Sequence, residues 1–190
     1  MPPEIQEDQT YTRITAANPV FSSRQFENCK FMNCDLSNAN LGGILFIDCV
    51  FEDCNLSLIS TVSTGLQNIR FRHCKLSGAN FTRCNDFLLE MHFENCILDN
   101  AIFFKKKNKK GIFKDCSLIE TDFTEADLTD AKFDNCNLHR AFFERTILKN
   151  ADISTSYNFI IDPDNNDIKK AKFSAQGLPG LLAKYDIRII

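Results

Sequence analysis

Nine cysteines and three histidines are the residues of this chain best suited to nucleophilic, redox or metal chemistry. Thiolates act as nucleophiles and as zinc ligands, and zinc-binding cysteines commonly occur in CxxC pairs. The sequence contains no CxxC pair, no Gly-rich phosphate-binding loop, and neither an HExxH nor a GxSxG motif. The cysteines instead follow a longer pattern, at Cys29, Cys34, Cys49, Cys54, Cys74, Cys84, Cys96, Cys116 and Cys136. This regularity indicates a structural role.

The longer pattern is a large apolar residue at every fifth position. It begins with Phe26, Phe31, Leu36, Leu41, Phe46, Phe51 and Leu56, and each cysteine lies two residues before such a position, where other blocks carry alanine. In a helix, apolar residues five apart would be spread around the whole surface, and in a strand, successive apolar residues of this series would lie on opposite faces. The period therefore predicts a chain that makes a short extended step, turns a corner and repeats, with these residues inside.

The blocks resemble one another again after four repeats. One column contains Phe31, Phe51, Phe71, Phe93, Phe113, Phe133 and Ile153, and the next contains Leu36, Leu56, Leu76, Leu98, Leu118 and Leu138. Four blocks per coil predict an all-β, square-sectioned parallel β-solenoid in which each coil lies on the last at the strand spacing. Parallel crossovers favour a right-handed coil. Stacked cysteines would point the same way, which suits a disulfide badly, so we expect reduced thiols.

Runs such as Ala39-Asn40-Leu41, Ala79-Asn80-Phe81 and Ala126-Asp127-Leu128 resemble the A(D/N)LXX blocks of the pentapeptide-repeat proteins. This resemblance implies a right-handed quadrilateral parallel β-helix. Within that family, the Cys- and Phe-rich blocks and the C-terminal extension are most similar to the Qnr-type quinolone-resistance proteins. The narrower resemblance implies a protein that imitates duplex DNA in width and charge and binds DNA gyrase or topoisomerase IV.

The repeat divides the chain into three parts. Residues 1–18 lack it and are expected to form an N-terminal cap, in which the TYTRIT run from Thr10 adds a short strand over the first coil. Residues 19–158 form the β-helix. Residues 159–190 form a C-terminal cap with a short helix from Gly177 to Tyr185 and Pro179 in its first turn.

The C-terminal cap also carries the predicted dimer interface. In the resembling family a helix here commonly closes the rod and pairs two subunits, which implies a homodimer with twofold symmetry. The apolar residues that would form its interface are Leu178, Leu181, Leu182, Tyr185, Ile187 and Ile189. Burial of this apolar tail within its own subunit is the alternative.

One departure from the period lies between Phe81 and Phe93, where the phase slips by two residues. The turn-forming pair Asn85-Asp86 is the predicted site of the insertion. A short loop should leave the rod there, and loops on a rigid scaffold tend to carry recognition.

A second departure is the Lys105–Lys110 segment. The five-residue period continues through this segment without a shift. Asn108 therefore falls at a core position, and Lys106 falls at a position where other blocks carry a small residue. We expect this side of the coil to be strained or bulged, with its lysines solvated. Contact with nucleic acid is the weaker alternative, because no aromatic residue is interleaved to stack on bases.

A rod without a catalytic arrangement points to recognition through its surface. The coil after the lysine segment carries an acidic strip, formed by Glu120, Asp122, Glu125, Asp127 and Asp130 with no basic residue among them. Large apolar residues expected to face outward could form a patch on the same sides. The predicted interaction residues are therefore Phe87, Leu89, Glu90, Phe104, Asp122, Glu125, Asp127 and Asp130.

Composition and charge narrow the function further. The chain is 44% hydrophobic and 25% charged, with a net charge of −3, and has neither a long apolar run nor a signal-like start, which predicts a cytoplasmic protein without membrane contact. No catalytic, cofactor-binding or metal-binding residue is predicted, and His73, His92 and His139 are expected to face outward among polar neighbours. We expect a non-enzymatic protein that binds a protein partner and makes no direct contact with nucleic acid.

Three functional hypotheses remain open. The first is a DNA mimic that binds DNA gyrase or topoisomerase IV and relieves quinolone poisoning, although a net charge of −3 is mild for such a mimic. The second is a scaffold for a protein partner unrelated to topoisomerases. The third and weakest is an enzyme regulated by thiol chemistry.

Overall fold

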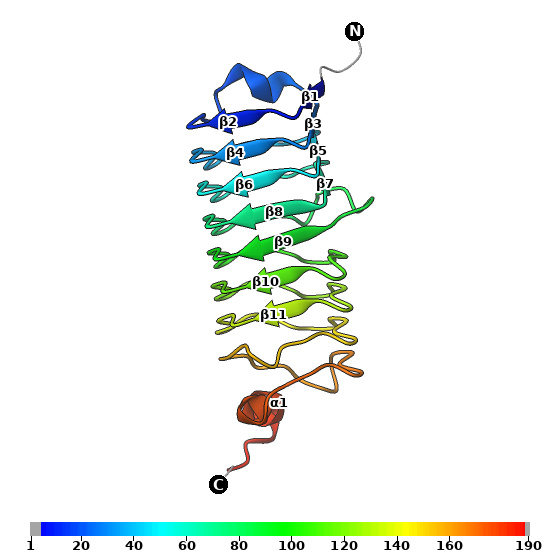
Figure 1. Ribbon diagram of the computed structural model, residues 1–190. Helices are drawn as coiled ribbons and strands as arrows, with labels where there is room; N and C mark the ends of the chain where they lie inside the picture. The colour runs from blue at the N-terminus through cyan, green and yellow to red at the C-terminus, as the bar shows by residue number, and fades with distance from the viewer. Residues whose placement is uncertain (1–4, 189–190) are drawn as a thin grey trace.

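The structure, a computed structural model that describes residues 5–188, is an elongated rod of stacked coils (Figure 1). The chain is a quadrilateral parallel β-helix, and a short helical segment lies at one end of it. Within residues 5–188, no helix is both long enough and apolar enough to cross a membrane.

One parallel sheet runs along most of the rod, and a second, shorter parallel sheet is confined to its N-terminal half (Figure 1). The strands are β1 (Ile5–Glu7), β2 (Thr10–Thr12), β3 (Gln25–Glu27), β4 (Lys30–Met32), β5 (Leu45–Ile47), β6 (Val50–Glu52), β7 (Gly65–Gln67), β8 (Ile69–Arg72), β9 (Met91–Glu94), β10 (Ile112–Lys114) and β11 (Lys132–Asp134), and a 3₁₀ turn, η1, covers Pro19–Ser22. One sheet has the order β1-β3-β5-β7 and the other β11-β10-β9-β8-β6-β4-β2. Partners lie twenty residues apart, except that Phe71 of β8 pairs with Phe93 of β9. Isolated bridges such as Asn40 to Ser60 continue the ladder on the other sides.

A residue in the left-handed conformation turns each corner. Asn28, Asn33, Asn38, Gly43 and Asp48, at intervals of five, have φ between 49° and 73°. Glycine, asparagine and aspartate adopt this region most readily. A corner every five residues in a coil of twenty residues gives the four-sided section.

The predicted apolar columns fill the inside of the rod. Ring centroids lie 4.7 Å apart both for Phe31 with Phe51 and for Phe113 with Phe133, and the rings are stacked. Phe123 of the neighbouring column meets Phe133 edge to face at 5.8 Å. These distances are close to the strand spacing, so the backbone ladder itself places each ring on its equivalent in the next coil.

The nine cysteines are buried and unpaired, as the sequence predicts. Most of their Sγ atoms donate to backbone carbonyl oxygens, as Cys49 does to Phe26 of the preceding coil at 3.4 Å. Burial raises the pKa of the Cys49 thiol to about 12 and that of the Cys84 thiol to about 11. Both thiols therefore stay protonated and serve as small apolar groups.

The array begins earlier than predicted. The strand at Thr10 is confirmed as β2, but β1 and β2 pair in register with β3 and β4, and the Tyr11 ring stacks on Phe31 at 5.1 Å. Residues 5–18 are thus a coil of the array and not a separate cap. The sequence hides this coil because Gln6 stands where the next coil carries Phe26.

The C-terminal helical segment begins at Ala175, two residues before the predicted start at Gly177, and ends at Tyr185 as predicted. It consists of η2 (Ala175–Gly177), α1 (Leu178–Leu182) and η3 (Ala183–Tyr185), with Pro179 in the first turn of α1. The segment packs tightly on the end of the rod, because a Cβ at Gly180 would lie 2.2 Å from the carbonyl oxygen of Phe159. The backbone amide of Ile161 also donates to Gly180 at 3.0 Å. This cap closes the last coil.

Candidate protein-interaction site

A loop at residues 85–90 interrupts the rod between β8 and β9. Asn85 donates its backbone amide to Thr64, whereas Glu90 donates to Leu66, so the pairing offset changes within this segment. The side chain of Asn85 accepts from the backbone amide of Phe87 at 3.0 Å, which is the local turn typical of asparagine. The predicted insertion and its position are confirmed.

Two adjacent apolar side chains project from this loop. Phe87 is 67% exposed and Leu88 is 63% exposed, whereas Leu89 is only 7% exposed. The prediction that Leu89 faces outward is therefore wrong, because Leu89 fills the core while Leu88, with φ of 54°, turns the corner. Leu88 is a surface residue that the sequence pattern does not identify, since spacing alone cannot tell which of two consecutive leucines enters the core after an insertion.

Lys106 anchors the start of the loop from the next coil. It is only 4% exposed, and its Nζ donates to the Cys84 carbonyl oxygen at 3.1 Å and to Oδ1 of Asp86 at 2.8 Å. The predicted small-residue position of Lys106 is confirmed. The expectation that all lysines of this segment are solvated is wrong for Lys106, because the buried Cys84 carbonyl and the exposed Asp86 carboxylate both accept hydrogen bonds from it.

Asn108 anchors the end of the loop. It is fully buried at the predicted core position, its Oδ1 accepts from the Met91 amide at 2.9 Å, and its Nδ2 donates to the Met91 carbonyl at 3.1 Å. The backbone around it keeps the regular corners, with φ of 61° at Lys105 and 58° at Lys110. The expected bulge is therefore absent from this segment.

The acidic strip lies against cations from the adjoining coils. Oxygens of Glu125 lie 3.4 Å from Nζ of Lys105 and 2.8 Å from Nη2 of Arg145. Asp127 pairs with Nζ of Lys109 at 3.0 Å. The hydrogen bond from Arg145, followed by that from Lys105, holds the pKa of Glu125 below its usual value. The strip is thus largely compensated within the rod.

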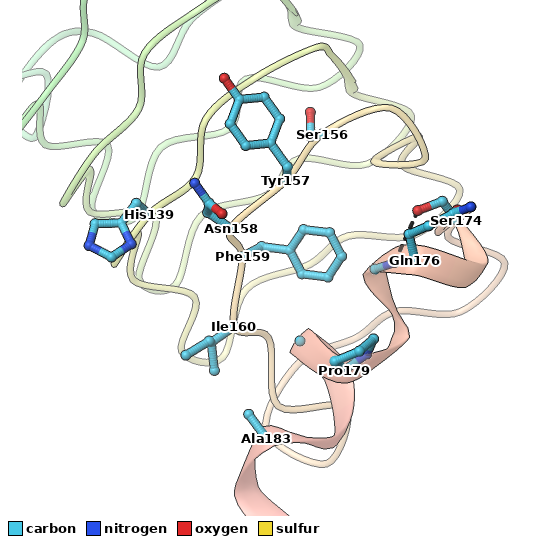
Figure 2. Close-up of a pocket in the computed structure, with 12 residues that line it drawn as sticks. His139, Ser156, Tyr157, Asn158, Phe159, Ile160, Ser174, Gln176, Pro179 and Ala183 are labelled. Atoms are coloured by element: carbon cyan, nitrogen blue, oxygen red, sulfur yellow. Dashed lines mark hydrogen bonds between the residues drawn. The ribbon is translucent and has the colours of Figure 1, made fainter. Parts of the chain in front are cut away.

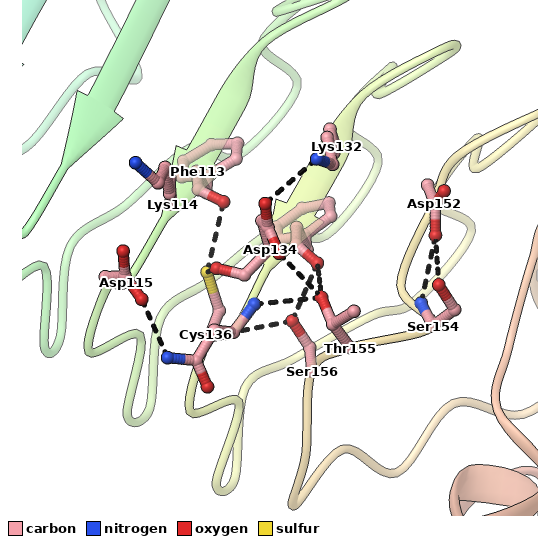
Figure 3. Close-up of polar contacts among 12 residues, drawn as sticks. Phe113, Lys114, Asp115, Lys132, Asp134, Cys136, Asp152, Ser154, Thr155 and Ser156 are labelled. Carbon is pink, nitrogen blue, oxygen red and sulfur yellow. Dashed lines mark hydrogen bonds and ion pairs between the residues drawn. The ribbon is translucent and has the colours of Figure 1, made fainter.

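The remaining acidic candidates accept hydrogen bonds from neutral groups. Asp122 accepts from the Thr124 amide at 2.8 Å, and Asp130 from the side-chain amide of Asn150 at 2.9 Å. Figure 3 shows similar local pairing further along the rod, where Lys132 lies 2.9 Å from Asp134. Part of this pairing can be seen in the sequence, because Lys105 and Arg145 each stand twenty residues from Glu125, and Asn150 stands twenty residues from Asp130.

The other candidate residues are spread over the surface. Glu90 is exposed and pairs with Nε2 of His92 at 2.9 Å. Phe104 is half-buried, with Nζ of Lys105 lying 4.9 Å from its ring centroid. His73 and His139 are exposed, as predicted, whereas His92 is half-buried. Residues 5–188 contain no group of three or more His, Cys, Asp or Glu residues able to hold a metal ion.

The predicted dimer residues have mixed environments. Leu178, Tyr185 and Ile187 are exposed, whereas Leu181 packs against the core of its own subunit and Leu182 is half-buried. Ile189 lies outside the described residues. The apolar tail is therefore buried only in part within its own chain.

A groove of about 520 Å³ separates this cap from the last coils (Figure 2). His139, Tyr157, Phe159 and Ile160 line one wall, and Pro179 and Ala183 of the helical segment line the other. Its polar groups come from several separate elements and include no buried charged side chain.

The repeat pattern of this chain matches that of a known protein family. A family model described as "Pentapeptide repeat region" matches residues 24–86 and 88–157. The chain belongs to the pentapeptide-repeat family. No curated protein matches this pentapeptide-repeat protein in sequence.

Two solved structures of pentapeptide-repeat proteins align with this chain. A trypsin-treated variant of QnrB1, described as a plasmid-mediated fluoroquinolone resistance protein, aligns with 22% identity over 98% of this chain and 97% of its own, with a TM-score of 0.50. HetL of the cyanobacterium Nostoc, described as involved in the regulation of heterocyst differentiation, aligns with 16% identity over 88% of this chain and 86% of its own, with a TM-score of 0.39. The similarity to QnrB1 supports the β-helical fold.

Proposed function

We propose that this pentapeptide-repeat protein is a non-enzymatic binding protein that recognises another protein through the loop at residues 85–90. The observation that carries the proposal is the adjacent pair Phe87 and Leu88, both more than 60% exposed on a loop anchored by buried side chains. Exposed aromatic and aliphatic residues on a rigid support are typical anchors of protein interfaces.

The absence of enzyme chemistry is part of this proposal. The nucleophilic candidates are enclosed, and burial raises the pKa of the Cys49 and Cys84 thiols to about 12 and 11. A thiol that stays protonated near neutral pH is a poor nucleophile. Nine unpaired cysteines also suit a reducing compartment, which supports a cytoplasmic location.

The proposed partner is DNA gyrase or topoisomerase IV. Support comes from the fold shared with QnrB1 over nearly the full length of both chains. DNA mimicry is a weaker form of this proposal, because the carboxylates of Glu125 and Asp127 are paired with cations of adjoining coils. A phosphate-like surface needs uncompensated charge, so we propose an interface in which apolar contact of the loop contributes more than charge.

Supercoiling by gyrase and decatenation by topoisomerase IV test the topoisomerase partner. Purified gyrase or topoisomerase IV would be poisoned with a fluoroquinolone, and the protein titrated to micromolar excess. We expect recovery of activity, with an affinity that changes little with salt. No recovery from either enzyme would remove topoisomerases as partners, and a steep loss of affinity with salt would favour DNA mimicry over apolar contact.

Matched variants test the loop itself. Phe87→Asp and Leu88→Asn should abolish recovery, and the second keeps a residue that tolerates the positive φ of its corner. Leu58→Asn is the control, because Leu58 is 61% exposed with φ of 57° on another part of the rod. Equal recovery by the Leu88 and Leu58 variants would exclude Leu88 from the interface.

A scaffold for a partner unrelated to topoisomerases is the second candidate function. The paired charges favour it over DNA mimicry, since they leave the exposed apolar pair as the main distinguishing surface. It predicts a partner whose purified complex with this protein resists salt and is lost on Phe87→Asp but kept on Leu58→Asn. Loss of binding with Leu58→Asn alone would place the interface elsewhere on the rod.

We further propose a homodimer formed through the C-terminal segment. Leu178, Tyr185 and Ile187 are about half exposed at the end of the rod within residues 5–188, so they present apolar surface there. A twofold contact between two such ends would cover this surface.

A further inference from the structure

We propose that Lys106 and Asn108 are positioning residues that hold the loop at residues 85–90 in one conformation. This conformation presents Phe87 and Leu88 to a partner, and that part of the inference rests on the proposed function. The positioning itself can be measured in the isolated protein. The insertion displaces two backbone groups from their regular hydrogen bonds.

The first displaced group is the carbonyl of Cys84. In the following coil the equivalent carbonyl is that of Lys106, and it accepts a regular ladder hydrogen bond from the Asp127 amide at 2.8 Å. The Cys84 carbonyl instead accepts from Nζ of Lys106 at 3.1 Å. A buried carbonyl without a partner is costly, so the lysine replaces a bond that the ladder supplies elsewhere.

The second displaced group is the amide of Met91. Its equivalents in the next two coils, Gly111 and Ala131, donate to carbonyls three residues earlier at 3.2 and 3.0 Å. The Met91 amide instead donates to Oδ1 of Asn108 at 2.9 Å, and the same side chain donates back to the Met91 carbonyl. Side chains of one coil thus take over hydrogen bonds at both ends of the loop in the coil before it.

Gly111 makes room for the Asn108 side chain. A Cβ at Gly111 would lie 2.3 Å from Nδ2 and 2.9 Å from Cγ of Asn108. Equivalent positions in other coils hold larger residues, such as Met91 and Ala131. The lack of a side chain at Gly111 therefore fits the buried side-chain amide of Asn108. This fit is a second observation that supports a positioning role for Asn108.

Burial also distinguishes these residues from ordinary surface side chains. Lys106 and Asn108 stand at positions where the next coil carries Ala126 and Leu128, in the core. Polar groups buried there destabilise the protein unless they are hydrogen-bonded. Their partners lie at the two ends of the loop, so the polar groups are stabilised only while the loop stays in place.

The test replaces each anchor by the residue that the next coil carries. Lys106→Ala and Asn108→Leu should leave the rod folded, because both restore the regular core pattern. Amide hydrogen exchange in residues 85–90 should become at least about tenfold faster, since the loop then opens locally. The rod strands should keep their protection. Gly111→Ala should loosen the loop in the same way, by displacing the Asn108 amide.

Lys109→Ala is the matched control. Lys109 lies in the same segment but is solvent-exposed and pairs with Asp127 of the next coil, away from the loop. Its loss should leave loop exchange unchanged. If Lys106→Ala and Asn108→Leu both leave loop exchange at the wild-type rate, or if exchange rises equally throughout the rod, the positioning role is wrong.

Partner affinity separates this inference from the proposed function. If the Lys106 and Asn108 variants show faster loop exchange and weaker partner binding, the result supports both the positioning role and the loop as the interface. An ordered loop loses less conformational freedom on binding. Faster exchange with unchanged binding keeps the positioning role and overturns the loop as the interface. If the wild-type protein protects neither topoisomerase, that partner is excluded while the exchange experiment still decides the positioning role.

Discussion

Replacement of Phe113 by alanine should weaken the rod more than replacement of any exposed phenylalanine. Phe113 is fully buried, stacks on Phe93 at 5.1 Å and on Phe133 at 4.7 Å, and meets Phe103 and Phe123 edge to face. Removal of a buried ring of this kind costs about 3–5 kcal/mol, because it combines lost burial with a cavity that the stacked backbone cannot collapse. For a chain of this size the melting temperature should fall by roughly 6–20 °C.

Two matched variants make the Phe113 prediction specific. Phe143 lies at the end of its column and stacks on Phe123 at 5.2 Å, whereas Phe113 contacts four rings, so Phe143→Ala should cost less, by about 0.5–1.5 kcal/mol for each of the three missing pairs. Phe142 is exposed, so Phe142→Ala should stay within about 0.5 kcal/mol of wild type. Urea unfolding followed by circular dichroism measures all three. A Phe113→Ala protein as stable as the Phe142→Ala protein would refute the ring-stacking account of the core.

Three further predictions follow from the thiols, the ion pairs and the cap. Because all nine thiols are buried, and burial raises the pKa of the Cys49 thiol to about 12, a thiol reagent should label the native cysteines slowly even above the usual thiol pKa of about 8.5, and rapid labelling before unfolding would contradict their burial. The free energy of unfolding should fall as the pH drops below about 4.3, since the Arg145 contact lowers the folded pKa of Glu125; that stability is present above the unfolded pKa and lost as the pH falls through the folded one. Urea titrations over pH should show a shallower acid loss for Glu125→Gln, and an unchanged pH profile would exclude this pair as a contributor. Light scattering should show a dimer that becomes monomeric on Leu178→Asp or Tyr185→Asp, and a wild-type monomer at high concentration would refute the dimer.

The repeating part of the fold can be predicted from the sequence because its cause is local and recurs. An apolar residue at every fifth position leaves only a four-sided coil, and the stacking of Phe31 on Phe51 follows from it. The same reasoning fails where the repeat is interrupted. The insertion near Asn85 is visible as a phase slip, but the phase does not say whether Leu88 or Leu89 turns inward.

The anchors of the loop could be located but not interpreted from the sequence. Lys106 and Asn108 are recognisable in the sequence as polar residues at interior positions, but a run of neighbouring lysines predicts solvated side chains. Only the structure shows that the insertion leaves the Cys84 carbonyl and the Met91 amide in need of partners. The compensation of the acidic strip was accessible to sequence reasoning, because residues twenty apart must lie side by side in such a coil.

The two extra residues of the loop have a consequence for the rod as a whole. The Phe71 and Phe93 rings on either side of it stack at 5.0 Å, within the range of the uninterrupted columns, so the insertion is absorbed within a single turn. A protrusion can therefore be carried at any level without bending the shaft. The position of such a loop along the rod axis can then change only in steps of about 4.8 Å, the spacing between coils. Its direction can change only in quarter turns, one for each side of the coil. The number of coils and the side that carries the loop therefore set where a binding element meets its target.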